Sequence, residues 1–193
     1  QRLKALAQEV QRIDSLVSDL RELNKVESPE MKLHKEEIEL PAFLQSFYTL
    51  FPETDERKGD LKIDCDVQTC RADRHYLYRA LSNVLENARK HGRGGEIALR
   101  VRREDDFFVF EVENQGRIDQ EKAEFFFDRL YRGSSSRSEP GSGLGLPITR
   151  AIMQAHGGEA VIEGRGEKTL VRLTLPVIDP PPALRKNGNR IRG

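Results

Sequence analysis

Apolar residues at the N-terminal end of the chain repeat in heptads, and this pattern restricts the fold more than any other feature. The spacing alternates between three and four residues for about three heptads, which predicts a helix with one apolar seam. The seam consists of Leu3, Leu6, Val10, Ile13, Val17 and Leu20, with Leu16 and Leu23 widening it on one side. A lone helix of this length is marginal in water, so the seam must pack on partner helices. Two arrangements fit equally well: one helix of a local bundle, or half of a dimerising helical hairpin.

The pattern changes after residue 39 into alternating helical and strand segments. The predicted helices cover residues 40–51, 73–90, 119–130 and 144–156. The predicted strands cover residues 61–67, 96–103, 107–113, 159–163 and 170–175, with an acidic turn at 104–106 and a polar loop at 131–142. This order predicts an α+β fold in which helices cover one face of a mixed sheet.

Charge and composition exclude several classes of protein. The 193 residues include 32 Lys and Arg and 32 Asp and Glu, and a net charge of zero argues against binding nucleic acid or an anionic membrane through bulk electrostatics. No apolar run approaches the roughly 18 residues that span a bilayer. Cys65 and Cys70 are too few for a disulfide framework or a metal site. Because the chain begins at Gln1, inside a helical pattern, we expect it to be a piece of a longer protein.

The helix predicted over residues 73–90 carries an unusual polar stripe. Asn83, Asn87 and Lys90 follow one another at i, i+4 and i+7, with His91 at the edge of the stripe. Amide oxygens accept a hard cation and Lys neutralises phosphate, so this stripe suits a magnesium–phosphate group. Taken alone, it is also compatible with an ordinary polar helix face. The apolar side of the helix is expected to pack on the sheet and consists of Leu77, Ala80, Leu81, Val84, Leu85 and Ala88.

Two turns add further candidates for ligand binding. Residues 141–147 read Gly-Ser-Gly-Leu-Gly-Leu-Pro immediately before an apolar helix, where unpaired N–H groups attract an anion. No Gly-Lys-Ser/Thr follows, so the run is not a P-loop, and no strand precedes it as in a dinucleotide fingerprint. At the end of a strand, Asn114 is either an acceptor for the amino group of a base or part of a plain Asn-Gln-Gly turn.

Taken together in this order, these motifs resemble the ATP-binding catalytic domain of sensor histidine kinases, which is related to gyrase and Hsp90-type ATPases. The long helix matches the N box, residues 114–118 the G1 box, residues 127–132 the F box and residues 141–146 the G2 box. The resemblance covers residues 1–177 and implies a two-layer α/β sandwich of the Bergerat (GHKL) type preceded by a long dimerisation helix.

The resemblance also implies a role for each motif residue. Asn87 would be the Mg²⁺ ligand, Asn83 would act at the γ-phosphate of ATP, and Lys90 would contact phosphate. His91 would lie beside the adenine, and Arg132 would reach the γ-phosphate. These implied roles make Asn83, Asn87, Lys90 and Arg132 the expected catalytic set.

The remaining ATP-binding residues come from the two glycine-containing boxes. Asn114 matches the position that reads the adenine amino group, and Gly116 and Ile118 belong to the same G1 box. The family usually has Asp where this chain has Asn114, and the second glycine of its G1 box is missing here, so we expect weakened nucleotide binding. The expected lid hinge and phosphate cradle consist of Gly141, Gly143, Leu144, Gly145 and Leu146.

The phosphoacceptor histidine of the family has no match in this chain. His34, His75, His91 and His156 are each followed by a residue that is not acidic. We therefore expect the chain to bind ATP without phosphorylating itself. The resemblance implies these units: the second helix of the dimerisation hairpin at 1–28, a linker at 29–38, the catalytic domain at 39–178 and a disordered tail at 179–193.

The resemblance further implies several partners and a location. We expect a homodimer formed through the N-terminal helix, a response-regulator receiver domain as phosphoryl acceptor, and no nucleic acid. Contact with a membrane would come only through parts of the parent protein absent here, and this portion would face the cytoplasm from the inner membrane of a bacterium. The alternatives are a degenerate ATP-binding or dimerisation scaffold without kinase activity, and an ATPase of the gyrase or Hsp90 kind.

Overall fold

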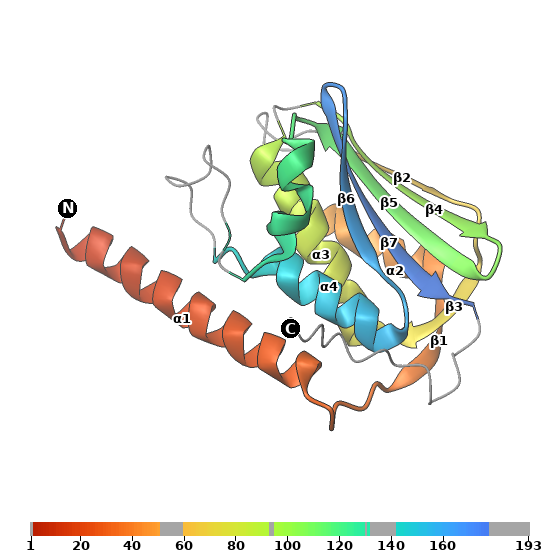
Figure 1. The fold of residues 1–193 in the computed structure, drawn as a ribbon, viewed down its shortest axis with the longest axis horizontal. Helices are drawn as coiled ribbons and strands as arrows, with labels where there is room; N and C mark the ends of the chain where they lie inside the picture. Colours follow the sequence, from red (N-terminus) through yellow and green to blue (C-terminus); the bar gives the residue numbers. More distant parts are fainter. Residues whose placement is uncertain (1, 51–59, 93–94, 130, 132–141, 178–193) are drawn as a thin grey trace, which may run out of the picture.

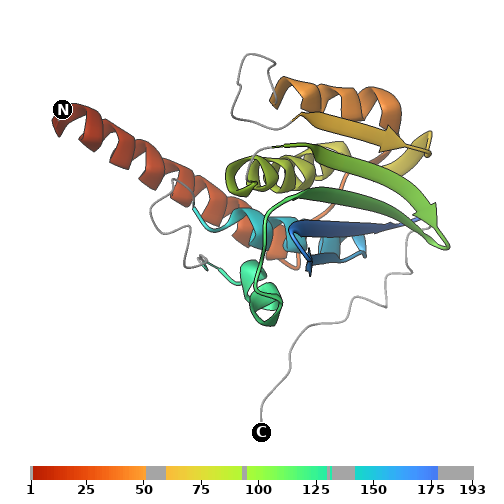
Figure 2. The ribbon, with the colours of Figure 1, turned by 90° about the horizontal axis from the view of Figure 1, so that it is seen from above.

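A five-stranded sheet with helices packed on one face forms the body of the computed structural model (Figures 1 and 2). The structure describes residues 2–50, 60–92, 95–129, 131 and 142–177. The strands of this sheet are β2 (Leu61–Cys65), β4 (Ile97–Glu104), β5 (Phe107–Gln115), β6 (Ala160–Arg165) and β7 (Lys168–Pro176). Their order is β2-β4-β5-β7-β6, with β2 and β4 parallel and the other neighbours antiparallel.

Alternation along the strands separates a core face from a charged face. The core face carries residues such as Leu99, Phe110 and Leu173, which are fully buried. On the opposite face Arg172 pairs with Glu111 at 3.3 Å and Lys168 pairs with Glu113 at 2.9 Å. The helices therefore pack on one side of the sheet, which is the layer arrangement that the sequence predicts.

Two helices, α3 (Arg74–His91) and α4 (Gly145–His156), lie side by side on the core face (Figure 1). Asp73 caps α3 by accepting a hydrogen bond from the Tyr76 N–H at 3.2 Å. Helix α4 ends at Gly157, whose φ of 89° lies in the left-handed region that glycine adopts most readily. The apolar residues that the sequence assigned to the inner side of α3 are all buried.

Helix α1 (Arg2–Glu27) packs its C-terminal half against α4 and extends away from the domain (Figure 2). Leu23 and Val26 are buried in this contact, and Leu16 packs against the same core. On the same face of α1, Arg79 of α3 bonds to Asp19 at 2.6 Å and to Glu22 at 2.8 Å. The predicted seam is not used in this packing, because its described side chains from Leu6 to Leu20 are 42–63% exposed.

The structure differs from the sequence prediction in several short elements. A two-stranded antiparallel sheet joins β1 (Lys35–Glu39) to β3 (Thr69–Asp73), and neither strand was predicted, because few of their residues are apolar. The helix predicted over 40–51 divides into α2 (Leu40–Gln45) and the 3₁₀ helix η1 (Ser46–Leu50). The helix predicted over 119–130 is a 3₁₀ helix, η2 (Gln120–Phe127). Within the described ranges, no helix is long and apolar enough to cross a membrane.

Candidate nucleotide-binding site

The polar stripe of α3 meets the beginning of α4. The Asn83 side chain is only 8% exposed, and its Nδ2 donates to the carbonyl oxygen of Gly145 at 3.1 Å. A Cβ atom added to Gly145 would lie 3.6 Å from Asn83 Cγ, so glycine allows the two helices to approach closely here. This contact joins two motifs that are 62 residues apart in the sequence.

The first turn of α4 presents backbone N–H groups without helical partners. Leu144 precedes the helix without providing a side-chain cap, and its own side chain is buried in the core. The Ile148 N–H is bonded to Leu144 O, and Pro147 has no N–H, which leaves the N–H groups of Gly145 and Leu146 as the donors of this turn. A helix N-terminus of this kind attracts an anionic group.

Thr149, whose role was not evident from the sequence pattern, holds this turn in place. Thr149 is fully buried, and its hydroxyl lies 2.9 Å from Gly145 O and 3.3 Å from Ala80 O. Together with Asn83, it fixes the start of α4 on α3. The sequence did contain one sign of this role, because Thr149 is a polar residue on the apolar face of α4.

Asn114 lies at the end of β5, beside the end of α3. Its side chain is 7% exposed, and Nδ2 donates to the carbonyl oxygen of Gln115 at 2.8 Å. Gly116 follows with φ of 148°, and a Cβ there would lie 3.3 Å from the carbonyl oxygen of His91. Thr169 of β7, which was also missed from the sequence, lies with its hydroxyl 2.8 Å from Gly116 O. The G1 segment is therefore tied to both neighbouring elements.

Two amide oxygens remain available to a ligand. Among the described residues, Ser82 Oγ is the one enclosed side-chain polar atom without a hydrogen bond. Asn83 Oδ1 and Asn114 Oδ1 have no hydrogen-bond partner among these residues and are not enclosed, so both reach the solvent. Each is held in a fixed orientation by the bond that its own Nδ2 makes.

The residues present fit a magnesium ion held chiefly by phosphate. Asn87 lies one turn after Asn83 and is half-buried, so its amide oxygen is accessible. The described residues contain no group of three or more His, Cys, Asp and Glu side chains that would form a cage. Mg²⁺ commonly takes few protein ligands and completes its shell with phosphate oxygens and water. Lys90 is exposed, and its Nζ lies 3.6 Å from the Glu86 carboxylate.

The other predicted positions divide into three groups. Arg132 and Gly141 lie outside the described residues, as does the tail at 179–193. Gly143, with φ of 71°, and the half-buried Leu146 lie at the start of α4, as predicted for the glycine run. Ile118 packs against the core, where a Cβ on Gly164 of β6 would lie 3.2 Å from Ile118 Cγ1.

One ion pair borders the site beside Asn114. Lys62 of β2 bonds to the carboxylate of Glu96, next to the crevice that Ala88, Gly92, Ile97 and Asn114 line. The hydrogen bond from Lys62 lowers the pKa of Glu96, and the same bond raises the pKa of Lys62. Both side chains are exposed, so the pair fixes local charge and adds little stability.

This arrangement defines a class of protein: an α/β sandwich domain in which an amide side chain of one helix contacts the glycine-containing start of the next. Comparison with known proteins identifies the class further. Residues 72–179 match the family model described as histidine kinase-, DNA gyrase B- and HSP90-like ATPase. The chain belongs to this family.

Among curated relatives, the probable sensor protein PcoS of Escherichia coli is 33% identical over 179 residues, or 90% of this chain. The sensor histidine kinase WalK of Bacillus subtilis is 31% identical over 180 residues, or 87% of the chain. This chain spans 38% and 29% of the lengths of those two proteins. The predicted resemblance to the catalytic domain of sensor histidine kinases is confirmed.

Solved structures agree with the fold. The catalytic domain of histidine kinase ThkA superimposes with a TM-score of 0.66 at 25% identity, covering 75% of this chain and 99% of that chain. Acinetobacter baumannii histidine kinase AdeS gives a TM-score of 0.73 at 21% identity, covering 91% of this chain and 83% of that chain. The predicted two-layer α/β sandwich preceded by a long helix is confirmed.

Proposed function

We propose that this chain is the part of a sensor histidine kinase that binds Mg²⁺–ATP and presents its γ-phosphoryl group to a histidine outside the chain. The observation that carries the proposal is the bond between Asn83 and Gly145, which joins the N box to the glycine-rich start of α4. The anion-binding helix end and the amide stripe thus face the same ligand. A solved relative, full-length ShkA, was crystallised in complex with AMPPNP, which supports a nucleotide as the ligand.

In this proposal each accessible group has one task. Asn114 Oδ1 accepts a hydrogen bond from the adenine amino group, and the N–H groups of Gly145 and Leu146 bind phosphate oxygens. Asn83 acts in positioning at the γ-phosphate through its Oδ1. Lys90 neutralises phosphate charge. Asn87 holds Mg²⁺, which supplies further neutralisation of phosphate charge when bound. The domain therefore acts by positioning and charge neutralisation and contributes no covalent intermediate.

The proposal extends to partners of the parent protein. The exposed seam on α1, from Leu6 to Leu20, needs apolar partners, and a second copy of the helix in a hairpin dimer provides them. A response-regulator receiver domain would take the phosphoryl group onward. ThkA, which has the same fold, was crystallised with response regulator protein TrrA, which is consistent with this role. The parent protein would lie in the inner membrane of a bacterium with this portion in the cytoplasm.

Titration with an ATP analogue tests the nucleotide site. We expect binding by isothermal calorimetry that strengthens with Mg²⁺, and we expect Asn87→Ala to abolish the strengthening while leaving metal-free binding unchanged. Asn24→Ala, at an exposed position of α1, is the matched control. Absence of binding at millimolar nucleotide would contradict the proposal. The parent protein incubated with γ-labelled ATP should form phosphohistidine, and a scaffold without kinase activity would form none.

A further inference from the structure

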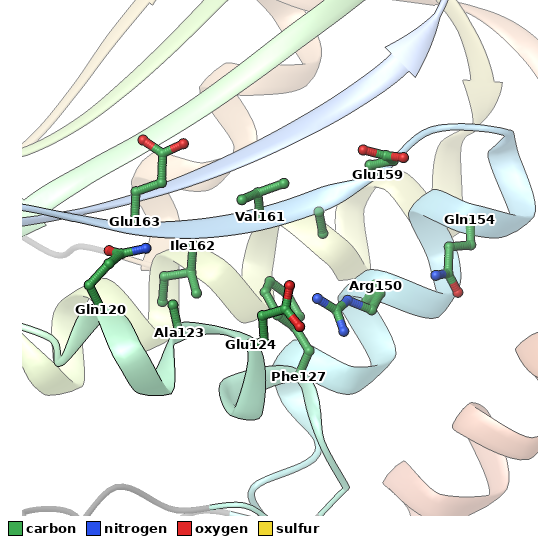
Figure 3. Close-up of a pocket in the computed structure, with 11 residues that line it drawn as sticks. Gln120, Ala123, Glu124, Phe127, Arg150, Gln154, Glu159, Val161, Ile162 and Glu163 are labelled. Atoms are coloured by element: carbon green, nitrogen blue, oxygen red, sulfur yellow. The ribbon is translucent and has the colours of Figure 1, made fainter. Parts of the chain in front are cut away.

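A second cavity, of about 600 Å³, lies on the side of the domain formed by η2, α4 and β6 (Figure 3). Ala123 and Phe127 of η2 and Arg150 and Gln154 of α4 line one wall, and the edge of β6 forms the other. None of the residues proposed to bind nucleotide lines it. We call this cavity the β6 groove.

The backbone of β6 is open toward this groove. Thr174 N–H donates to Glu159 O at 2.9 Å, so these two residues form a hydrogen-bonded pair of the antiparallel ladder. The alternation of such ladders turns the backbone groups of Ala160 and Ile162 away from β7. Gly164 follows the same alternation, and its outward N–H donates to Gln120 Oε1 of η2 at 2.7 Å. Thus η2 covers the far end of the edge, while the outward groups of Ala160 and Ile162 have no partner in the described part of the chain.

The rim of the β6 groove is acidic. Figure 3 shows Glu124, Glu159 and Glu163 around it. Glu163 pairs with Arg165 at 3.2 Å, but neither Glu124 nor Glu159 has an ion-pair partner among the described residues. The one cation of the lining, Arg150, stacks over the Phe127 ring at 3.9 Å from its centroid. An extended segment with cationic side chains therefore fits the groove in both backbone and charge.

We propose that residues 183–193 of this same chain bind in the β6 groove as a strand added to the edge of β6. This segment carries Arg185, Lys186, Arg190 and Arg192 and no acidic residue. The chain leaves β7 at Val177, three residues after Thr174, whose partner Glu159 stands at one end of the groove. The five residues 178–182 span at most about 16 Å when extended, enough to cover the roughly 10 Å back to Glu159 and cross β6.

Residue-resolved amide exchange tests this proposal on the full chain. We compare the full chain with a variant that ends at Pro182. Exchange at Ala160 and Ile162 should be at least about tenfold slower in the full chain, because their N–H groups are then bonded to the added strand. A synthetic peptide of residues 183–193 should restore slow exchange to the truncated chain, and raising the ionic strength to about 0.5 M should weaken this effect.

Charge variants locate the interaction at the groove. The double variant Glu124→Lys, Glu159→Lys should make exchange as fast as truncation does, and adding Arg185→Glu with Lys186→Glu should slow it again. Glu121→Lys, on η2 outside the groove, is the matched control and should change nothing. The Gly164 amide, already bonded to Gln120, reports that each variant is folded. Equal exchange in the full and truncated chains overturns the proposal, as does protection that grows with protein concentration, which would mean a second copy's segment.

Discussion

Replacing Asn114 by Asp tests the base-reading role that we propose for this position. The family resemblance implies Asp at this position, and a charged acceptor strengthens a hydrogen bond to the adenine amino group by about 1 kcal/mol, which is about fivefold in affinity. The sequence by itself therefore predicts that Asn114→Asp is a gain. The structure adds a cost, because Asn114 Nδ2 donates to Gln115 O at 2.8 Å.

The size of that cost follows from what Asp would place in the same position. A carboxylate oxygen would face the Gln115 carbonyl oxygen, and two acceptors cannot bond. The net hydrogen bond, about 0.5–1.5 kcal/mol, is lost, and a poorly solvated acceptor is left without a donor at about 1–3 kcal/mol. Since Asn114 is only 7% exposed, we expect the free energy of unfolding to fall by roughly 1.5–4.5 kcal/mol.

Urea unfolding and nucleotide titration measure the two effects separately. We expect Asn114→Asp to lower the unfolding midpoint and to raise affinity for Mg²⁺–ATP analogue at most about fivefold. Asn114→Ala should instead weaken binding by about twofold to tenfold, since it removes the acceptor altogether. Asn24→Asp, on exposed α1, should shift stability by less than about 0.5 kcal/mol. If Asn114→Asp is as stable as the unmodified chain, the hydrogen bond to Gln115 O does not contribute this free energy of unfolding, and the reasoning is refuted.

The remaining predictions concern packing and thiol chemistry. Gly158→Ala should destabilise the chain by more than about 3 kcal/mol in urea unfolding, because its Cβ would lie 1.8 Å from Thr174 O. The control Gly166→Ala lies in open space at φ of 64° and should cost only about 1–2 kcal/mol. Leu23→Ala should cost about 2–5 kcal/mol, whereas Ile13→Lys should leave unfolding unchanged and weaken any self-association measured by sedimentation. Burial raises the pKa of Cys70 to about 12, so iodoacetamide should label this thiol slowly at pH 8 and faster as the pH rises toward that value. The unfolded chain should be labelled fully at pH 8. Equal labelling of the native and unfolded chains at that pH would contradict the burial.

Much of the fold was predictable because its signals are local. The apolar side of α3, the acidic turn between β4 and β5 and the glycine end of α4 each depend on residues within a few positions of one another. Strands β1 and β3 were missed for the same reason. Ile38 and Cys70 are buried opposite each other, but the remaining pairs are mostly polar, so their pairing is a property of two segments and of neither alone.

The candidate site was predictable in its residue types and less so in its contacts. The spacing of Asn83 and Asn87 and the glycine run before α4 are visible in the sequence, and they led to the family that the comparisons establish. The supporting hydroxyls of Thr149 and Thr169 were not visible, because a single threonine within an apolar segment has many possible partners.

The heptad seam shows where the limit lies. The sequence by itself determined that residues 2–27 form a helix with apolar residues to bury, since periodicity is written within that segment. Only the tertiary structure decided that Leu23 and Val26 pack on the domain while Val10, Ile13 and Val17 stay exposed. That choice depends on the shape of α4 and on the charge of Arg79, which lies 60 residues along the chain from Asp19. The periodicity within a segment determines which side chains it can bury, and the surfaces of other elements determine which of them it does bury.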